Sequence, residues 1–568
     1  MRVLILDGHS RAALESAQSL GRRGAEIDLA CESEVCLAFA SRYVANRLRQ
    51  PPSVPADHVR EWLVRKHGER NYDLIVPSTD VALNVMRSLE ESHPVRTKAV
   101  LPGSRSLDIA VDKLSTYRVA QALGIALPHA ITIPQHGPVP ECERYPVVLK
   151  SRHSRVVMAG VNRRLEAVIA RDATQRERVL ASWLPYTAVQ QQEFVFGRGF
   201  GIEMLFDRGR ALWHFAHERV HEMPLTGGGS SYRRSIAPPP HLLQMAERLL
   251  GELSWHGAAM VEFRGDGRGR DYLMEINPRL WGSLALPIDC GVDFPAGLAA
   301  LATAQRVPAQ PRYRIGYFTR DLASDVQWHK VNLRADHHDP LLLTRGRLAS
   351  TLELLRPLYG RESWDFFDWS DLAVTRKMLK QAVRWELARF TSRMRIARGR
   401  RTGSAHHQAV KEVVAAKGCP RRLLFLCYGN ICRSPLAALM AERELSGVRV
   451  VSAGFQDVEG RSPPGHVCRA ANGKGLDLGE HLSRRVRETD VKEADLILCM
   501  DLQNLESVRR EFPEALTRTT LLGLFAAEPL MEIADPYWLS VDEARHVIES
   551  IRLSLLGLSR WLENLSKR

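Results

Sequence analysis

The stretch LLFLCYGNICRSPLAALM, residues 423–440, constrains the fold of this chain more than any other. Its apolar run ends at Cys427, and a short polar loop leads to Arg433, where a helical pattern begins. An apolar strand followed by a loop and a helix is typical of α/β folds, whose sites lie at the carboxyl ends of strands. A cysteine followed by a basic residue at this spacing is expected about once by chance in such a chain. The surrounding residues must therefore decide whether Cys427 is a nucleophile or a buried thiol.

The loop after Cys427 has the chemistry of an anion site. Backbone N–H groups of a loop that enters a helix, together with the helix dipole, form a cradle for an anion and favour a cysteine thiolate. Arg433 supplies a forked donor for two phosphate oxygens, and Ser434 can donate a hydrogen bond to the thiolate. Gly429 and Asn430 tolerate the unusual backbone angles of a tight loop. The predicted phosphate loop comprises Tyr428, Gly429, Asn430, Ile431 and Cys432.

A phosphoryl-cysteine mechanism also needs an acid that protonates the leaving oxygen. The stretch EIADPYWLS offers Asp535, fixed by Pro536, with Tyr537 or Trp538 as a wall for an aryl phosphate. CYGNICRSP, VSAGF, ADLILCMD and DPY occur in the order of the low-molecular-weight protein tyrosine phosphatases, and residues 420–568 resemble this family. The resemblance implies a cofactor-independent phosphatase of phosphotyrosine proteins or small aryl phosphate esters, with Cys427 as nucleophile, Arg433 as transition-state clamp, Ser434 as thiolate partner and Asp535 as general acid and later base.

Two further cysteines leave alternatives open. Cys432 either forms a disulfide that protects the nucleophile, as in members of this family, or is a small buried residue. Arsenate reductases share the fold and need relay thiols, for which Cys499 is the candidate. The helix after Cys499 contains no second cysteine, so phosphate-ester hydrolysis is favoured over arsenate reduction.

Length and composition set the class of the whole protein. At 568 residues the chain is too long for one hydrophobic core, which predicts three or four domains. With 45% hydrophobic and 25% charged residues it reads as a globular protein, and no apolar run is long enough to span a bilayer. The nine cysteines lack paired zinc spacings, so we expect reduced thiols in a cytoplasmic protein.

The N-terminal hundred residues alternate between strand and helix. RVLILD, EIDLAC and YDLIVPST are apolar runs separated by helical patterns, which predicts an open parallel sheet with crossover helices. The first turn, DGHSRAALES, lacks the G-x-G-x-x-G fingerprint, so no dinucleotide site is predicted there.

The middle of the chain contains separate polar positions that suit a nucleotide. Lys150 ends the apolar strand of YPVVLK and Lys113 opens a helix, and each can meet nucleotide phosphates. In QQQEFVFGRGF, a turn between two strands can present the carboxylate of Glu193 and backbone groups of Val195 to an adenine.

The stretch MVEFRGDGRGRDYLMEINPRLWGS predicts two strands joined by a Gly-rich turn. Glu275 and Asn277 leave the same face of one strand, and Glu262 comes from its neighbour. These oxygens suit Mg²⁺, and Arg279 on that face suits a transferring phosphoryl group. The glycines of residues 227–229 are either a loop that closes over phosphates or a surface turn.

DK, YPVVLK, QEF and EINPR occur in the order of the ATP-grasp superfamily, and residues 1–310 resemble its branch similar to the ATP-binding domain of carbamoyl-phosphate synthase. Such domains activate a carboxylate as an acyl phosphate that an amine attacks, which implies ATP with Mg²⁺, or alternatively Mn²⁺, and carboxylate and amine substrates. A domain of this kind can also keep ATP binding and lose ligase chemistry. The resemblance assigns phosphates to Lys113 and Lys150, adenine to Glu193 and Val195, and metal to Glu262, Glu275 and Asn277.

The net charge of +14 is concentrated in residues 376–401, which contain ten Lys/Arg and one Glu. Met378, Leu379 and Val383 recur near helical spacing there, as do Leu387, Phe390 and Met394, which predicts an amphipathic basic helix. It either connects two domains as a solvated helix or binds an anionic membrane surface or an acidic partner. No nucleic-acid partner is expected, since no reader motif accompanies the charge.

These patterns predict an α/β multidomain enzyme. The predicted domains are an open α/β domain over 1–105, an α+β ATP-grasp domain over 106–310, a helical basic connector over 311–418 and a phosphatase domain with a central parallel sheet over 419–568. The predicted function is a phosphatase joined to an ATP-dependent carboxylate–amine ligase. Two alternatives are a phosphatase regulated by an inactive ATP-binding module and a membrane-associated scaffold.

Overall fold

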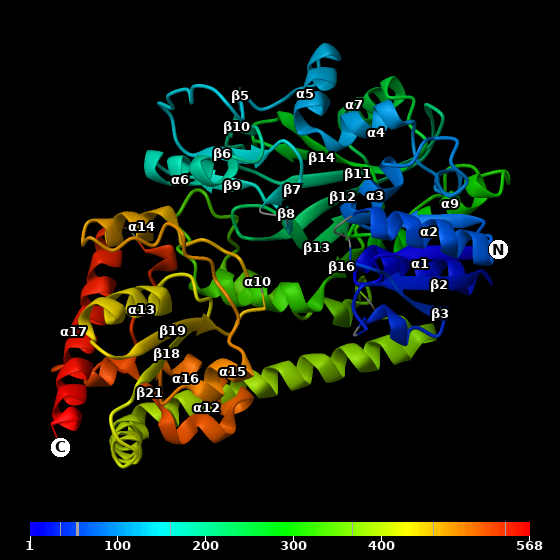
Figure 1. Ribbon diagram of the computed structural model, residues 1–568. Helices are drawn as coiled ribbons and strands as arrows, with labels where there is room; N and C mark the ends of the chain where they lie inside the picture. Colours follow the sequence, from blue (N-terminus) through cyan, green and yellow to red (C-terminus); the bar gives the residue numbers. More distant parts are fainter. Residues whose placement is uncertain are drawn as a thin grey trace. The chain divides into compact units, whose positions relative to one another are not determined.

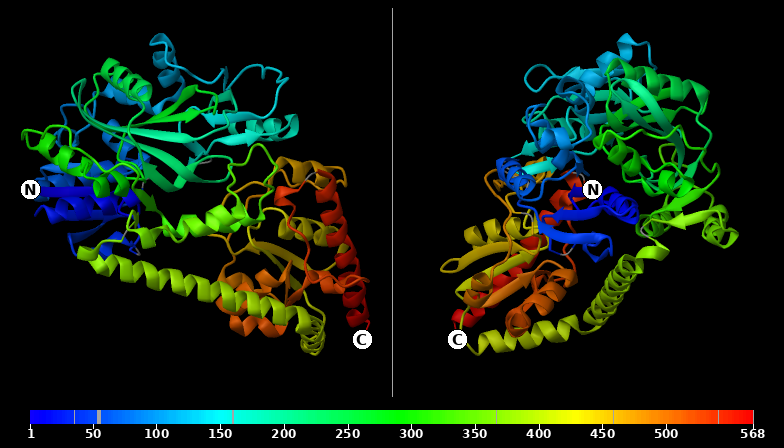
Figure 2. Two further views of the ribbon diagram at one scale, coloured as in Figure 1. Left: turned by 180° about the vertical axis from the view of Figure 1, so that it is seen from behind. Right: turned by 90° about the vertical axis from the view of Figure 1, so that its right-hand side faces the viewer.

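The computed structural model describes residues 1–34, 36–52, 56–158, 161–365, 367–457, 459–539 and 541–567. The chain divides into two compact units, Met1–Ala382 and Val383–Arg568, which Figures 1 and 2 show from three sides. The fold is multidomain α/β, as the sequence predicted. The 44-residue helix α12 (Leu372–Ala415) begins in the first unit and ends in the second. The four predicted domain ranges stay predictions.

Unit 1 opens with a parallel sheet whose strand order is β3-β2-β1-β4. Apolar side chains on both faces of this sheet are buried. Helix α1 packs on one face, and helices α2 and α3 pack on the other. The order reverses at β1, which opens a crevice between the carboxyl ends of β1 and β4. The bounds are β1 (Arg2–Leu6), β2 (Glu26–Cys31), β3 (Val44–Arg49), β4 (Leu74–Pro77), α1 (Arg11–Arg22), α2 (Ala56–Arg70) and α3 (Asp80–Arg87).

A small antiparallel sheet follows, with the order β5-β10-β6-β9 and helix α6 packed on it. A separate two-stranded hairpin, β7–β8, lies between β6 and β9 in the chain. The bounds are α4 (Ser104–Val111), α5 (Lys113–Ala122), β5 (Ala130–Ile133), β6 (Val147–Ser151), β7 (Arg155–Met158), β8 (Val161–Arg164), β9 (Val168–Ala170), α6 (Ala173–Trp183) and β10 (Val189–Glu193).

The largest sheet has seven strands in the order β15-β14-β11-β12-β13-β16-β17. Helices α4, α5 and α7 pack on one face, and α9 packs on the other together with the N-terminal sheet. Strands β16 and β17 lie in the range 311–418 that was predicted as a helical connector, and three residues each are too few to show an alternation in the sequence. The bounds are β11 (Gly199–Asp207), β12 (Arg210–Met223), β13 (Gly229–Ser235), α7 (Pro240–Glu252), β14 (Gly257–Gly265), β15 (Asp271–Asn277), α8 (Ala285–Cys290), α9 (Phe294–Ala302), β16 (Phe318–Arg320), α10 (Leu322–Arg334), α11 (Arg347–Glu353) and β17 (Glu362–Trp364).

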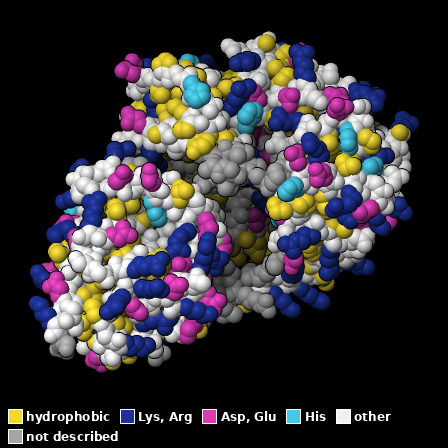
Figure 3. All heavy atoms as spheres, in the orientation of Figure 1, with side chains coloured by type: hydrophobic (Ala, Val, Ile, Leu, Met, Phe, Trp, Pro, Cys, Tyr) yellow, Lys and Arg dark blue, Asp and Glu magenta, His cyan; other side chains and the backbone are white. Residues whose placement is uncertain are grey.

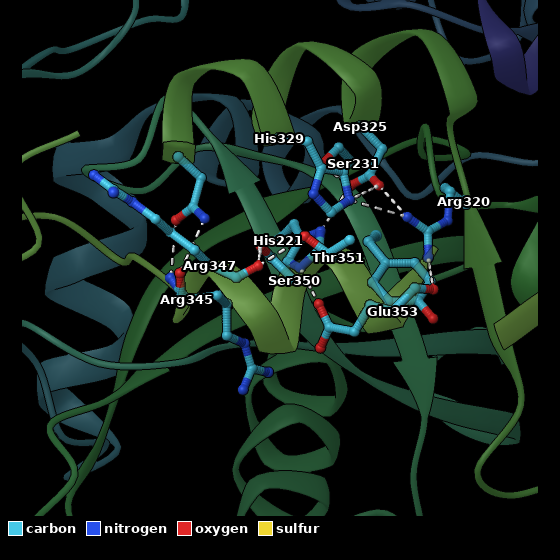
Figure 4. Close-up of polar contacts among 12 residues, drawn as sticks. His221, Ser231, Arg320, Asp325, His329, Arg345, Arg347, Ser350, Thr351 and Glu353 are labelled. Carbon is cyan, nitrogen blue, oxygen red and sulfur yellow. Dashed lines mark hydrogen bonds and ion pairs between the residues drawn. The ribbon is translucent and has the colours of Figure 1, made fainter. Parts of the chain in front are cut away.

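A network of buried charged side chains joins strand β12 to the segment from β16 to β17, as Figure 4 shows. The Nδ1 atom of His221 lies 2.8 Å from Asp325, and its Nε2 atom lies 2.9 Å from Glu353. Arg320 donates to Asp325 and, at 2.7 Å, to Glu362. Burial raises the pKa of Asp325, but hydrogen bonds from the histidines and the charge of Arg320 outweigh burial and lower it. The network is therefore charged and mutually compensated.

The side chains of His221, Asp325 and His329 meet the distance expected of a metal-ligand group, since their ligand atoms lie within 4.8 Å of one another. The guanidinium of Arg320 is hydrogen-bonded to Asp325 and lies 3.4 Å from His329 Nε2. Arg320 therefore supplies a positive charge beside Asp325 and His329, and we interpret the cluster as structural.

Unit 2 is built on a parallel sheet with the order β19-β18-β20-β21. Helices α13, α14 and α17 cover one face and helices α15 and α16 the other, so the unit is a three-layer α/β fold. The bounds are β18 (Arg422–Cys427), α13 (Arg433–Glu444), β19 (Arg449–Gly454), α14 (Gly465–Asn472), α15 (Glu488–Glu493), β20 (Leu496–Cys499), α16 (Leu502–Glu511), β21 (Thr519–Leu521) and α17 (Val541–Ser566).

Short 3₁₀ turns complete the two units, at Ala38–Ala40, Arg96–Lys98, Arg356–Tyr359, Trp369–Asp371, Pro513–Arg518, Leu522–Phe525 and Pro536–Trp538.

The predicted basic helix lies within α12. The side chains of residues 384–402, which include Leu387, Phe390 and Met394, lie outside the described residues, so the predicted apolar stripe is untested there. On the face shown in Figure 3, Lys and Arg side chains are interspersed with acidic ones. Within the described ranges, no helix is long and apolar enough to cross a membrane.

Candidate active sites

Cys427 is the last residue of β18, the strand with partners on both sides in the sheet of unit 2. It lies beside Gly454, the last residue of β19, and its neighbour Leu426 lies beside Cys499 of β20. Because all four strands are parallel, the segments that follow them meet at one edge of the sheet. The carboxyl ends of three strands thus surround the buried thiol of Cys427.

The loop from Cys427 to Arg433 directs polar groups at this thiol. The backbone N–H of Asn430 donates to Cys427 Sγ at 3.2 Å, and Ser434 Oγ lies 3.0 Å from the same sulfur. Asn430 has φ of +50° and its amide donates to Ser434 and Ser452 at 3.1 and 3.0 Å. The predicted thiolate partner, Ser434, is therefore in contact with the sulfur, and Asn430 fixes the loop around it.

The guanidinium of Arg433 is held by two acids that lie far from it in the chain. Its Nη1 atom donates to Asp501 at 2.6 Å and to the carbonyl of Ile533 at 3.1 Å, and Nη2 donates to Asp535 at 3.1 Å. Burial lowers the pKa of Arg433, but the negative charges of Cys427, Asp501 and Asp535 outweigh burial and raise it. The predicted clamp and the predicted acid are thus direct neighbours.

The remaining predicted residues of this site differ in exposure. Tyr428 is exposed at the rim, and Tyr537 is exposed beside Asp535, whereas the side chain of Trp538 lies outside the described residues. Cys432 and Cys499 are buried, and burial raises the pKa of each thiol. All nine cysteines, each in a described part of the chain, are free thiols.

The second site is a cleft of about 630 Å³ in unit 1, bordered by all three of its main sheets. The three glycines of residues 227–229 also border it, held by hydrogen bonds from Gly228 to Glu222 at 3.0 Å and from Arg219 to Gly228 at 2.9 Å. The predicted residues that line the cleft are Lys113, Lys150, Val195, Glu262, Glu275, Asn277 and Arg279.

Two carboxylates face each other in this cleft. Glu262 of β14 and Glu275 of β15 are directly opposite in the strand ladder, and Asn277 donates to Glu262 at 2.9 Å. Burial raises the pKa of Glu275, but Lys113, Lys150 and other cations outweigh burial and lower it. Carboxylate and amide oxygens are the ligands that Mg²⁺ prefers, so this set could hold a divalent cation.

The two predicted phosphate lysines come from different elements. Lys113 is the first residue of α5 and donates to Ser154 at 2.8 Å. Lys150 lies on β6, where burial lowers its pKa to about 8. Asp112 caps α5 and pairs with Arg152 at 2.7 Å, which fixes the start of this helix beside the end of β6.

The structure separates Glu193 from the other predicted residues. Its side chain is exposed, accepts from the backbone N–H of His129 at 2.9 Å, and does not border the cleft, whereas Val195 is buried and does. Arg279 is paired with Asp80, the first residue of α3, at 2.6 Å. The assignment of Glu193 to adenine stays a prediction.

Comparisons with known proteins match two different families in the two units. Residues 422–568 match the family described as low molecular weight phosphotyrosine protein phosphatase. A protein-arginine-phosphatase of Geobacillus stearothermophilus is 35% identical over 145 residues, which are 25% of this chain and 97% of that protein. The chain belongs to the low molecular weight phosphotyrosine protein phosphatase family. The low molecular weight protein-tyrosine-phosphatase Etp of Escherichia coli (strain K12) is 30% identical over 145 residues, 26% of this chain and 95% of that protein.

Unit 1 matches a different family. Residues 192–321 match the family described as ATP-grasp in the biosynthetic pathway with Ter operon. The chain is therefore an enzyme in which an ATP-grasp region is joined to a phosphatase. Among solved structures, an L-amino acid ligase from Bacillus licheniformis is similar with a TM-score of 0.43 and 15% identity, over 54% of this chain and 75% of that one.

Several residues of these sites were missed by sequence reasoning. In the phosphatase unit, Asp501 follows β20 and holds Arg433, a position that the carboxyl-edge rule of parallel sheets can indicate. In the ATP-grasp unit, Arg219 pairs with Glu262 at 2.5 Å, and Arg264 pairs with Glu222 at 2.5 Å. Arg264 follows Glu262 by two residues on β14 and so leaves the same face of the strand, a signal that was available in the sequence, whereas Arg219 lies in no local pattern that points to the cleft.

Proposed function

We propose that the C-terminal unit hydrolyses aryl phosphate monoesters through a phosphoryl-cysteine intermediate. The observation that carries the proposal is the convergence of Asn430 N–H and Ser434 Oγ on Cys427 Sγ, at 3.2 and 3.0 Å. These two groups stabilise a thiolate and can aid its departure. The charged fork of Arg433, from the same loop, supplies donors for phosphoryl oxygens.

Each step then has a residue that performs it. The thiolate of Cys427 attacks phosphorus and forms the S–P bond while the P–O bond to the aryl group breaks. Asp535 gives its proton to the leaving oxygen. In the second step Asp535 takes a proton from water, whose oxygen attacks phosphorus, and the S–P bond breaks to return the thiolate and release phosphate.

A second substrate class is phosphoarginine in proteins, because the name of the Geobacillus stearothermophilus relative states that activity. The exposed Tyr428 and Tyr537 favour the aryl class, since aromatic side chains can flank a phenyl ring. The two classes are distinguished by comparing kcat/KM for a phosphotyrosine peptide and a phosphoarginine peptide. A higher kcat/KM for the phosphoarginine peptide would replace the aryl assignment.

The test of the phosphatase is hydrolysis of phenyl phosphate by the full chain. Cys427→Ser is expected to abolish it, and Cys468→Ser, which changes a partly buried cysteine of α14, is the matched control. Wild-type-like hydrolysis by Cys427→Ser would overturn the mechanism.

For unit 1 we propose an ATP-dependent ligase that joins a carboxylate to an amine. Lys113 and Lys150 would hold the phosphates, Val195 the adenine, and Glu262, Glu275 and Asn277 a Mg²⁺ or Mn²⁺ ion. When bound, the metal neutralises phosphate charge during transfer. The support is the facing pair of Glu262 and Glu275 beside two lysines, in a cleft large enough for a nucleotide.

ATP turnover distinguishes a ligase from an inactive ATP-binding module that regulates the phosphatase. ADP release is measured over a panel of carboxylates and amines for wild type, Glu275→Ala and Glu252→Ala, an exposed glutamate of α7. We expect only Glu275→Ala to lose turnover. If the wild-type protein binds ADP but releases none under any condition, and Glu275→Ala behaves in the same way, the ligase assignment is lost.

We also propose a cytoplasmic location, with residues 376–401 as a contact for an anionic membrane surface or an acidic partner. The test is sedimentation with phosphatidylserine vesicles of wild type and a variant with its ten Lys/Arg in this range changed to Gln. Equal pelleting would remove the membrane role and leave a connecting helix or a contact for an acidic partner.

A further inference from the structure

Asp535, the proposed acid of the phosphatase, stands at the end of a loop. This acid loop, residues 526–534, is described throughout and contains no helix or strand. It begins directly after the 3₁₀ turn Leu522–Phe525, which itself follows β21. Near its end, the backbone N–H of Ile533 donates to the carbonyl of Met500 at 2.9 Å. The contacts that hold the acid loop and the turn before it therefore decide where the acid lies.

The C-terminal end of α12, residues 403–415, packs on this part of unit 2. The buried residues of this end recur at spacings of three or four and are Gly403, His407, Val410 and Val414. Such spacings place residues on one face of a helix. The two valines belong to the apolar core that also contains Phe525, from the 3₁₀ turn, and Ile533, from the acid loop. This end of α12 is therefore part of the core that carries the acid loop.

Two neighbouring histidines of α12 contact the elements that lead into the acid loop. His406 Nε2 lies 2.9 Å from the carbonyl oxygen of Thr519, and His407 Nδ1 lies 3.0 Å from Oγ1 of Thr520, both on β21. The ring of His407 meets that of Phe525 edge-on, with centroids 4.6 Å apart. Burial lowers the pKa of His407 to about 4, so the ring is neutral in these contacts at neutral pH. The helix thus holds both β21 and the turn that follows it.

A glycine on the same face of α12 lies against the acid loop itself. A Cβ at Gly403 would lie 2.9 Å from both Sδ and Cε of Met531, which precedes Asp535 by four residues. Glycine weakens a helix interior, but at this position it leaves room for the methionine side chain. Met531 also packs on the apolar core of the other sheet face in unit 2. The acid loop is therefore enclosed between α12 and the body of the unit.

We propose that the C-terminal end of α12 positions the acid loop, and so keeps Asp535 within hydrogen-bond reach of the leaving oxygen. Gly403 and His407 are positioning residues, because they lie against the loop and the turn before it and act on the reaction only through the acid. This inference rests on the proposed phosphatase function, in which Asp535 protonates the leaving group. The support comes from outside residues 422–568, the range that matches the phosphatase family.

The experiment measures kcat of the full chain for phenyl phosphate and p-nitrophenyl phosphate. Phenolate needs a proton to leave, whereas nitrophenolate leaves without one, so the ratio of the two rates reports the position of the acid. In Gly403→Leu, whose side chain displaces Met531, and in His407→Ala, we expect kcat for phenyl phosphate to fall at least tenfold. For p-nitrophenyl phosphate it should fall less than threefold. The matched controls, Ala405→Leu and Gln408→Ala, change exposed positions of the same helix and should leave both rates unchanged.

Met531→Ala removes the contact from the side of the loop and needs no new space in the core. We expect the same selective loss for phenyl phosphate, at least threefold, and this variant decides if Gly403→Leu does not fold. Equal losses for the two esters would overturn the positioning role, because damage to the fold or to the loop of Cys427 lowers both rates alike. Absence of any loss would overturn it as well.

Asp535→Asn, measured in parallel, separates this inference from the proposed function. A selective loss in Asp535→Asn together with unselective or absent losses in the Gly403, His407 and Met531 variants would overturn the positioning role alone. Equal losses for the two esters in Asp535→Asn would remove the acid role itself, and the positioning role with it.

Discussion

The guanidinium of Arg433 is hydrogen-bonded to Asp535 at 3.1 Å, although 102 positions separate the two residues in the chain. Its other nitrogen is held by Asp501 at 2.6 Å, so the fork is oriented without a ligand. We expect a phosphate that accepts from this fork to compete with Asp535 and free its carboxyl for the leaving oxygen. The proposed clamp and the proposed acid are therefore coupled through one side chain.

Asp535→Asn removes the acid and keeps the size of the side chain. We expect kcat for phenyl phosphate to fall by about 10²–10⁴-fold, the usual contribution of a general acid. For p-nitrophenyl phosphate the fall should be smaller, because nitrophenolate leaves without a proton. Steady-state rates for both esters check this, with Glu528→Gln, an exposed residue before the same loop, as control. Equal losses for the two esters would contradict the acid role.

Gly454→Ala tests the close approach of β19 to the phosphate loop. A Cβ at this position would lie 2.7 Å from Asn430 N and 2.9 Å from Tyr428 O, both backbone atoms that cannot move independently. Such overpacking costs about 1–3 kcal/mol, and we expect phosphatase activity to fall at least tenfold. Gly473→Ala is the control, because its Cβ would meet only ordinary contacts at 3.6 Å and its φ is −62°. Full activity of Gly454→Ala would show that the loop tolerates displacement.

Nucleotide affinity should depend on pH through Lys150. Burial lowers the pKa of this lysine to about 8, so it is charged below that pH and neutral above it. Phosphate binding favours the charged form, and ADP affinity is therefore expected to fall as the pH rises through about 8, by at most about tenfold per pH unit. Calorimetry from pH 7 to about 9.5 measures this. Lys150→Arg, charged throughout, should give a flatter profile, and an equally steep profile would exclude Lys150 as the cause.

Arg320→Met tests the buried network of Figure 4. The substitution leaves Asp325 and Glu362 buried without their shared cation, which costs about 3–5 kcal/mol of folding free energy. Urea unfolding followed by tryptophan fluorescence reports it, because Trp328 stacks on His221 in this network with ring centroids 3.4 Å apart. Arg361→Met, at an exposed position before β17, should change stability by less than about 0.5 kcal/mol. Equal stability of the two variants would mean that the network compensates itself without Arg320.

Much of the phosphatase site could be predicted from the sequence because its residues are close in the chain. Cys427, Arg433 and Ser434 lie within eight consecutive residues, so a strand, a loop and a helix start already bring them together. Asp535 was assigned from the order of motifs, and only the fold makes it a neighbour of Arg433. Asp501 received no role, although it follows a strand at the same sheet edge.

The amino-acid sequence by itself determined the elements and the local sites: the apolar strands, the loop of Cys427, and the alternation that puts Glu275 and Asn277 on one face. Tertiary structure alone decided which charges meet. Arg279 pairs with Asp80 across 199 positions, Arg320 pairs with two acids of different elements, and Glu193 does not border the cleft. Strand and helix periodicity depends on neighbours in the chain. Electrostatic energy depends on the distance between charges in space, and these distances are set only once the sheets are assembled.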